Sequence, residues 1–279
     1  MRTLRAIAEF RMARRGLGEV GVVPTMGFLH EGHLSLVRRA KAECGTAAVT
    51  IFVNPTQFAP HEDFTRYPRA LERDLELVQA AGADLVFAPG AGEIYPEGFD
   101  TRIDVGQVTT RLEGAVRPSH FAGVATVVAK LLNITGATRA YFGQKDAQQT
   151  VVIRRLVRDL NIPSEIVVCP TVREADGLAM SSRNTYLAPD QRARATVLYR
   201  ALKAAEALAD EGETRAEALR DLVRRILAEV ANDGVDYVSV AHPDTLEELD
   251  DISAGALISL AVRFGETRLL DNVMLASRR

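Results

Sequence analysis

The chain has 279 residues, of which 47% are hydrophobic, and a formal net charge of -3 at pH 7. This length and apolar content are sufficient for a buried core in one large domain or two of ordinary size. Because acidic and basic residues are interspersed, there is no basic stripe to hold a nucleic-acid backbone, and no apolar run approaches the ~20 residues that span a bilayer. We therefore expect neither a nucleic acid nor a membrane as partner.

The first 16 residues, MRTLRAIAEFRMARRG, are arginine-rich and helical in pattern. A transit peptide would be enriched in serine and poor in acidic residues, whereas this segment contains Glu9 and leads directly into a strand pattern. We expect a first surface helix. The two cysteines, Cys44 and Cys169, have no partner at C-x-x-C spacing, which favours a reducing, cytoplasmic location.

From residue 20 to about residue 170, short β-rich apolar runs alternate with amphipathic helical patterns. The predicted strands are 20–25, 47–53, 84–89, 139–143 and 164–170, and the helices between them are 33–43, 70–82, 121–135 and 147–160. This alternation predicts an α/β fold, a Rossmann-like parallel sheet with helices on both faces. Ligands of such sheets bind at the carboxyl ends of the strands.

The pattern changes after residue 188. Two long helical patterns, 191–209 and 214–231, precede three strand-like runs at 235–243, 256–265 and 268–275. Helices followed by antiparallel-looking strands predict a smaller C-terminal α+β domain. We place the boundary in the polar segment before residue 188, which gives domains at 1–175 and 176–279.

The segment GLGEVG, residues 16–21, matches the G-x-G-x-x-G pattern of dinucleotide-binding folds. That pattern binds a pyrophosphate only when it follows a strand and opens a helix, and here it leads into a strand. Dinucleotide binding is therefore disfavoured. The P-loop pattern G-x-x-x-x-G-K-[ST] is absent from the sequence.

The segment PTMGFLHEGHLSLV, residues 24–37, places His30 and His33 where a predicted strand gives way to a helix. Zinc is disfavoured because H-E-x-x-H needs the histidines four positions apart and a third ligand is lacking. A packed histidine pair at a helix start remains an alternative. The context favours a phosphate cradle, in which imidazole N–H groups lie beside the free amides of a helix N-terminus and Gly32 allows close approach.

Six segments occur in the order found in pantothenate synthetases, the pantoate–β-alanine ligases of the H-x-G-H nucleotidyltransferase superfamily, and the chain resembles this family closely over residues 24–187. They are PTMGFLHEGHLSLV, IFVNPTQF, YPR, RPSHFAGVATVV, YFGQKDAQQ and TVREADGLAMSSRNTYL. The resemblance implies a ligase that condenses (R)-pantoate with β-alanine to pantothenate, a coenzyme A precursor. The reaction would consume ATP, pass through a pantoyl adenylate, and release AMP and pyrophosphate. The resemblance also implies a homodimer.

The resemblance assigns three segments to ATP. The first would comprise Met26, Gly27, Phe28, Leu29, His30, Glu31, Gly32 and His33; the second Gly143, Gln144, Lys145 and Asp146; and the third, a flexible phosphate-binding loop, Met180, Ser181, Ser182 and Arg183, with Val172 contacting adenine through its backbone. Among these, His33, His30, Lys145 and Arg183 would be catalytic and absorb the charge of the transition state. A solvated polar linker is the alternative for the third segment.

The resemblance assigns Gln57 and Gln149 to pantoate, with Asn54 beside Gln57. An amide at the carboxyl end of a strand suits hydroxyl and carboxylate groups, although a polar loop that only caps the strand is the alternative. Two positions depart from the family pattern, since Gln144 stands where a glutamate is common and Ala147 where an aromatic residue is common. Ala147 is expected to loosen the packing behind the site.

A magnesium ion is expected because ATP carries one, held mainly by phosphate oxygens. Asp74 aligns with an acidic residue near the metal in the family, but the neighbouring family acid is replaced here by Arg73, and a surface aspartate on a helix is the alternative.

The C-terminal domain would close as a lid that keeps the adenylate from water. Two rival functions remain. One is another H-x-G-H nucleotidyltransferase that acts on a different acid or phosphate ester. The other is a non-catalytic protein that binds ATP without releasing pyrophosphate.

Overall fold

The computed structural model describes residues 1–59, 62–229 and 234–277. The chain forms two compact units, one of Met1–Gly143 with Val152–Pro170 and the other of Gln144–Val151 with Thr171–Arg279. Residues 144–151 thus belong to the second unit although residues on both sides of them belong to the first. A single boundary along the chain cannot describe this division. The domain limits 1–175 and 176–279 stay a prediction.

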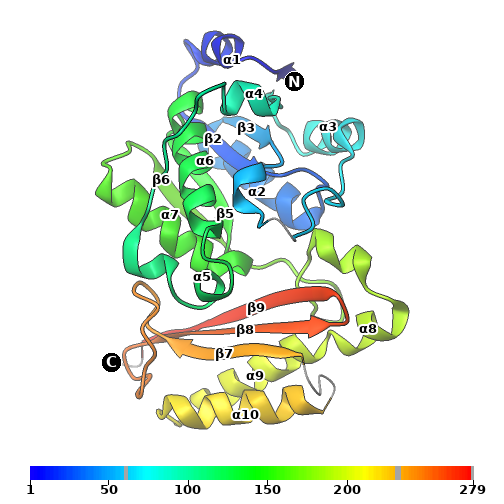
Figure 1. The fold of residues 1–279 in the computed structure, drawn as a ribbon, viewed down its shortest axis with the longest axis vertical. Coiled ribbons are helices and arrows are strands. Elements are labelled where there is room, and N and C mark those ends of the chain that lie inside the picture. The colour runs from blue at the N-terminus through cyan, green and yellow to red at the C-terminus, as the bar shows by residue number, and fades with distance from the viewer. Residues whose placement is uncertain (60–61, 230–233, 278–279) are drawn as a thin grey trace. The chain divides into compact units, whose positions relative to one another are not determined.

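The first unit is built on a six-stranded parallel sheet of order β1-β4-β3-β2-β5-β6 (Figure 1). The Rossmann-like parallel sheet predicted from the sequence is confirmed. The strand at 2–4 was not predicted, because three residues are too few to show an alternating pattern. The strands are β1 (Arg2–Leu4), β2 (Val20–Thr25), β3 (Thr46–Ile51), β4 (Leu85–Phe87), β5 (Arg139–Gly143) and β6 (Glu165–Cys169).

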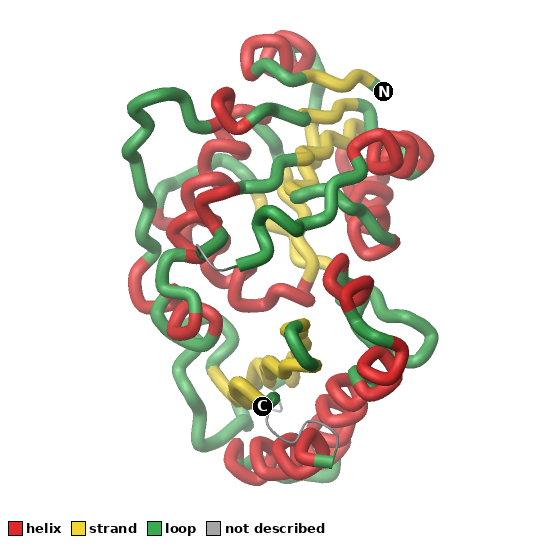
Figure 2. The backbone as a smooth tube through the Cα atoms, turned by 45° about the vertical axis from the view of Figure 1, so that its right-hand side comes forward, coloured by secondary structure: helices red, strands yellow, loops and turns green. Residues whose placement is uncertain are grey.

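Helices lie on both sides of this sheet (Figure 2). None of the helices in the described part of the chain is long and apolar enough to cross a membrane. The helices are α1 (Ile7–Arg14), α2 (Glu31–Cys44), α3 (Leu71–Ala80), α4 (Ala91–Ile94), α5 (Glu113–Val116), α6 (His120–Thr135) and α7 (Ala147–Asp159), with short 3-10 turns η1 (Pro55–Gln57), η2 (Gly106–Thr109) and, in the second unit, η3 (Gln144–Asp146).

The central strand β2 positions the loop of interest. Its residues are buried or half-buried, as expected for a strand covered on both faces. Pairing from Val20↔Thr46 to Thr25↔Ile51 brings the carboxyl ends of β2 and β3 to the same edge. The strand order reverses between β2 and β5, so the loop after β2 begins at a topological switch point, where open parallel sheets bind ligands.

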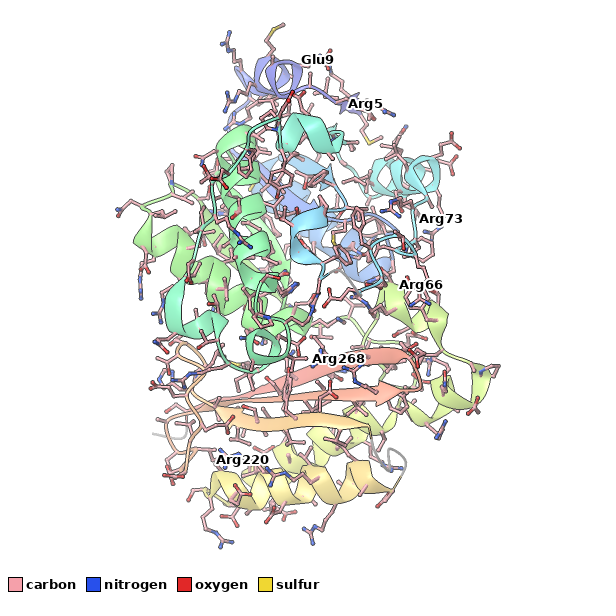
Figure 3. The ribbon with its side chains drawn as sticks, viewed as in Figure 1. Arg5, Glu9, Arg66, Arg73, Arg220 and Arg268 are labelled. Carbon is pink, nitrogen blue, oxygen red and sulfur yellow. The ribbon has the colours of Figure 1, made fainter. Side chains whose placement is uncertain are left out.

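The second unit contains an antiparallel sheet of order β7-β8-β9, which confirms the predicted α+β arrangement. Its elements are η4 (Ser182–Tyr186), α8 (Pro189–Arg194), α9 (Val197–Asp210), α10 (Ala216–Ala228), β7 (Val235–Ala241), β8 (Ala256–Phe264) and β9 (Thr267–Leu275). Apolar side chains of α9 and α10 pack with those of the sheet in one core. Buried Arg220 of α10, labelled in Figure 3, donates to Glu248 at 2.6 Å and to the carbonyl oxygens of Val240 and Leu249.

The single helix predicted over 191–209 is wrong, since two helices, α8 and α9, occupy this stretch. At the break, the Thr196 hydroxyl donates to the carbonyl oxygen of Ala193 at 2.9 Å, and Leu198 N–H bonds to Ala195, three positions back. Such local side-chain bonding competes with the regular helix. The predicted end of the next helix, at residue 231, lies outside the described residues.

We expect Gly21→Ala to lower the free energy of unfolding by about 1–3 kcal/mol through overpacking. A Cβ at Gly21 would lie 2.8 Å from a ring carbon of Tyr141 and 2.9 Å from the Cβ of Ala40, and both neighbours are fully buried. Urea unfolding followed by circular dichroism measures the change. The control is Gly18→Ala, whose Cβ would have nothing within 4 Å. Equal stability of the two variants would contradict the packing argument.

Candidate active site

The loop after β2 turns sharply before α2. Gly27 has φ 85° and Phe28 has φ 51°, both in the left-handed region. Glycine adopts this conformation without steric cost, whereas a phenylalanine there stores strain of about 1–2 kcal/mol. Gly27 N–H donates to the hydroxyl of Thr25 at 3.2 Å, which closes the turn at the end of the strand. The loop is therefore a defined, strained turn.

His30 and His33 lie side by side at the start of α2. Their ring centroids are 4.1 Å apart and their planes are tilted by 45°. The backbone N–H of His30 donates to Nδ1 of His33 at 3.4 Å. Since Nδ1 accepts, a neutral His33 ring carries its proton on Nε2 and is a donor there. The structure brings the two predicted catalytic histidines together at the start of α2.

The amides of the loop are largely committed within the chain. The N–H groups of Phe28 and Leu29 donate to the carboxylate of Asp74, and that of His30 to His33. Within α2, the N–H groups of His33 and Leu34 donate to the carbonyl oxygen of His30 at 2.8 and 3.2 Å. The expected cradle therefore relies mainly on the two histidine side chains.

Asn54, predicted to contact substrate, is a buried organiser of η1. Its amide group donates to Oε1 of Gln57 at 3.1 Å and to the carbonyl oxygen of Gly123 at 3.2 Å. Its oxygen accepts from the hydroxyls of Tyr95 at 2.8 Å and Thr56 at 2.9 Å. These bonds use both donors and both acceptor sites of the side chain, which is 1% exposed. The substrate contact of Asn54 stays a prediction.

Gln57 joins the loops that follow β2 and β3. Its Nε2 donates to Sδ of Met26 at 3.1 Å, while its Oε1 accepts from Asn54. Gln57 is half-buried. Two predicted residues 31 positions apart, one assigned to ATP and one to pantoate, are thus in direct contact.

The backbone of Gln57 is held by Arg117, which follows α5, and by His120, which begins α6; neither residue was given a role from the sequence. His120 Nδ1 lies 2.9 Å from the carbonyl oxygen of Gln57, and Arg117 donates to the same oxygen at 3.2 Å while pairing with Glu62 at 2.5 Å. Burial, followed by the charge of Arg117, lowers the pKa of His120 to about 4. His120 is therefore neutral near pH 7 and donates from Nδ1. The signal available in the sequence was a histidine at the start of the helical segment HFAGVATVV.

In the second unit, η3 is held by β9. The amide of Asn272 donates to the carbonyl oxygens of Gln144 at 3.0 Å and Lys145 at 2.9 Å, and its oxygen accepts from Nε2 of Gln144 at 3.0 Å. The Lys145 ammonium lies 3.2 Å from Oδ1 of Asp146, and the Lys145 side chain is 21% exposed. The predicted phosphate-binding lysine is thus fixed through its backbone while its ammonium remains near solvent.

Asp271 and Asn272 of β9 are buried polar residues that were not predicted as part of the site. Asp271 is buried and accepts two bonds from Arg173, at 2.6 and 2.9 Å. The signal was a pair of polar residues within the apolar pattern RLLDNVML. Because an unpaired buried carboxylate is costly, such a pair in a strand indicates a long-range polar contact.

The segment from Val172 to Arg183 folds back on itself. The carbonyl oxygen of Val172 accepts Met180 N–H at 3.0 Å, and the hydroxyl of Ser181 accepts Arg183 N–H at 3.3 Å where η4 begins at Ser182. The carbonyl of Val172 is therefore engaged by the loop itself, and the contact of the Val172 backbone with adenine stays a prediction.

The remaining predicted residues have no described contact with another predicted site residue. Gly143 ends β5 in the first unit, Gln149 is half-buried in the first turn of α7, and Gly32 lies in the first turn of α2. Glu31 forms an ion pair with Arg38.

Asp74, predicted to lie near magnesium, is buried and 1% exposed. Its oxygens accept the N–H groups of Phe28 at 2.7 Å and Leu29 at 2.8 Å, and Arg73 lies 3.8 Å away. These contacts fix the carboxylate against the loop after β2. Among residues 1–59, 62–229 and 234–277, no group of three or more His, Cys, Asp or Glu could hold a metal. The metal contact stays a prediction.

Comparisons with known proteins cover nearly the whole chain. A family model described as pantoate–β-alanine ligase matches residues 1–274. The pantothenate synthetase of Chloroflexus aggregans is 60% identical over 276 residues, which cover 99% of this chain and 100% of that protein. The crystal structure of pantothenate synthetase from Thermus thermophilus has a TM-score of 0.94 and 53% identity, covering 98% and 99% of the two chains. That of a pantoate–β-alanine ligase from Francisella tularensis, complexed with β-γ ATP and β-alanine, has a TM-score of 0.80 and 35% identity, covering 98% and 97%.

The lowered pKa of His120 predicts a pH dependence of stability. Between the ordinary pKa of 6.5 and about 4, the unfolded chain binds a proton that the folded chain does not. The contribution of neutral His120 to the free energy of unfolding should therefore be fully present above pH 6.5. It should be lost as the pH drops from 6.5 to 4, which lowers the free energy of unfolding by up to about 3 kcal/mol. In His120→Asn, which keeps a neutral donor, this loss should be absent from urea unfolding curves. His242→Asn, which substitutes a histidine of the second unit, is the control. A His120→Asn variant with the wild-type pH dependence would refute the assignment.

Proposed function

The chain belongs to the pantoate–β-alanine ligase family and is a ligase that forms an amide bond, and we propose that it condenses pantoate with β-alanine through a pantoyl adenylate at the expense of ATP. The observation that carries this proposal is the family match over residues 1–274, in a chain that has His30, His33, Lys145 and Arg183 at the motif positions.

In the first proposed step, a carboxylate oxygen of pantoate attacks the α-phosphorus of ATP. A P–O bond to the acid forms, the bond to the β-phosphate oxygen breaks, and pyrophosphate leaves. Positioning and charge stabilisation provide nearly all the catalysis of such a transfer. We assign the Nε2–H of His33, with His30 beside it, to the developing charge, and the cations of Lys145 and Arg183 to the phosphate oxygens.

In the second step, the neutral amine of β-alanine attacks the acyl carbon of the adenylate. The C–N bond forms, AMP leaves with the bonding electrons of the C–O bond, and the amine loses a proton. Activation is required because a free carboxylate is a poor acceptor for an amine. The adenylate must be protected from water, and we assign that task to residues 176–279 acting as a lid.

Pantoate recognition is assigned to Gln57 and Gln149, whose amide groups can bond to hydroxyl and carboxylate oxygens. Asn54 supports Gln57, since its amide donates to Oε1 of Gln57 at 3.1 Å. This bond leaves Nε2 of Gln57 pointing to Met26 in the ATP loop, which supports neighbouring positions for the acid and the nucleotide.

Three further assignments belong to the proposal. Magnesium enters with ATP and is held mainly by phosphate oxygens. The location is cytoplasmic, which agrees with Cys44 and Cys169 as free buried thiols. We assign a homodimer because the resemblance to the family implies one. Analytical ultracentrifugation would measure the mass of the assembly in solution.

The reaction sequence predicts which substrates release which product. Pyrophosphate should appear with ATP and pantoate alone, and AMP release should require β-alanine as well. Coupled assays for pyrophosphate and AMP measure both. Silence with pantoate but turnover with another acid or a phosphate ester would replace the ligase with another nucleotidyltransferase. ATP binding without any pyrophosphate release would indicate a non-catalytic protein.

We expect His33→Ala and Lys145→Ala each to lower the rate of pyrophosphate release by about 100-fold or more, because each removes a donor to the transition state. Urea midpoints should change little. His242→Ala and Lys203→Ala, which remove the same residue types at positions of the second unit with no assigned role, are the controls. Near-wild-type rates in either site variant would remove its assigned role.

A further inference from the structure

The turn at Gly27 and Phe28 needs support from outside the loop. Phe28 has φ 51°, a conformation that a residue with a Cβ adopts rarely. A strained backbone persists where its surroundings hold it, and such positions cluster at ligand-binding loops. The contacts that hold residues 28 and 29 are therefore informative about function.

Asp74 holds the loop by its amides. Oδ2 accepts Phe28 N–H at 2.7 Å and Oδ1 accepts Leu29 N–H at 2.8 Å, so the two oxygens of one carboxylate engage two consecutive amides. Hydrogen bonds to an ionised carboxylate are stronger than those between neutral groups. A Cβ at Gly27 would lie 3.0 Å from Oδ2, so Gly27 also permits this approach.

Arg73, labelled on α3 in Figure 3, contacts the same two residues, Phe28 and Leu29, with a cationic side chain. Its guanidinium donates to the carbonyl oxygen of Leu29 at 3.2 Å and lies 5.4 Å from the ring centroid of Phe28. It also lies 3.8 Å from Oδ1 of Asp74, so opposite charges attract each other beside the loop. Arg73 occupies the position at which the resemblance places a second acid.

We propose that Arg73 and Asp74 form a clamp that sets the backbone of Phe28 and Leu29 in the conformation from which the following histidines meet ATP. Asp74 is a positioning residue in this proposal. It acts through the loop amides, and magnesium is left to the phosphate oxygens. The inference rests on the proposed assignment of residues 26–33 to ATP.

The first test measures the loop without any nucleotide. In Asp74→Asn, one side-chain oxygen can still accept an amide, but the new NH2 group faces the other amide as a second donor. Amide hydrogen exchange of Phe28 and Leu29, followed by NMR on the 15N-labelled full chain, should be about 10-fold faster or more. Exchange of amides in β7–β9 of the second unit should be unchanged.

The second test measures catalysis. Because the clamp positions the ATP loop, kcat/KM for ATP should fall about 10- to 100-fold in Asp74→Asn, and KM for β-alanine should not change. Arg73→Gln, which removes one bond and the ring contact, should give a smaller loss of about 5-fold. Glu72→Gln is the matched control, since it removes the same charge from an exposed position of the same turn.

Two results would overturn the clamp. One is unchanged exchange of Phe28 and Leu29 in Asp74→Asn. The other is an Asp74→Asn variant that needs more magnesium for its half-maximal rate while the amides of Phe28 and Leu29 exchange as in the wild type. That result would make Asp74 a metal ligand. If the wild-type chain releases neither pyrophosphate nor AMP with pantoate and β-alanine, the proposed function fails, whereas the exchange measurement still decides the clamp.

Discussion

The parallel pairing of β2 with β3 is the constraint on which the site of the first unit depends. Because pairing continues to Thr25↔Ile51, the segments that follow the two strands start at the same edge of the sheet. The contact of Gln57 with Met26 follows from this arrangement. Both faces of β2 are buried, so a slip of one residue would turn every buried side chain to the opposite face, and the register is strongly specified.

Local patterns predicted the elements whose causes are local. The strands β2 and β5 have the predicted limits, since short apolar runs of the right length identify buried strands. The strand β1 was missed because three residues carry no period. At the break between α8 and α9, the Thr196 hydroxyl donates to the carbonyl oxygen of Ala193, a local bond that the apolar spacing does not reveal.

The residues of the candidate site likewise fall into two groups, those that a local motif indicates and those that only the fold brings close. Its motif residues could be predicted from resemblance because they follow strand ends in a characteristic order. Their supports could not, because they come from distant parts of the chain: Asp74 is 46 positions from Phe28, His120 is 63 from Gln57. No local pattern contains such contacts. What a sequence does contain is a polar residue where the pattern requires an apolar one, and burial then forces it to find a partner.

The pair formed by Gln144 and Asn272 links the side chain at position 144 to the orientation of one buried amide. Two backbone carbonyl oxygens fix the amide of Asn272, so its oxygen must face a donor, which Gln144 supplies. A carboxylate at position 144 would face that oxygen without a proton to donate. The orientation of the Asn272 amide and the amide at position 144 are thus a single requirement shared by two side chains that lie 128 positions apart.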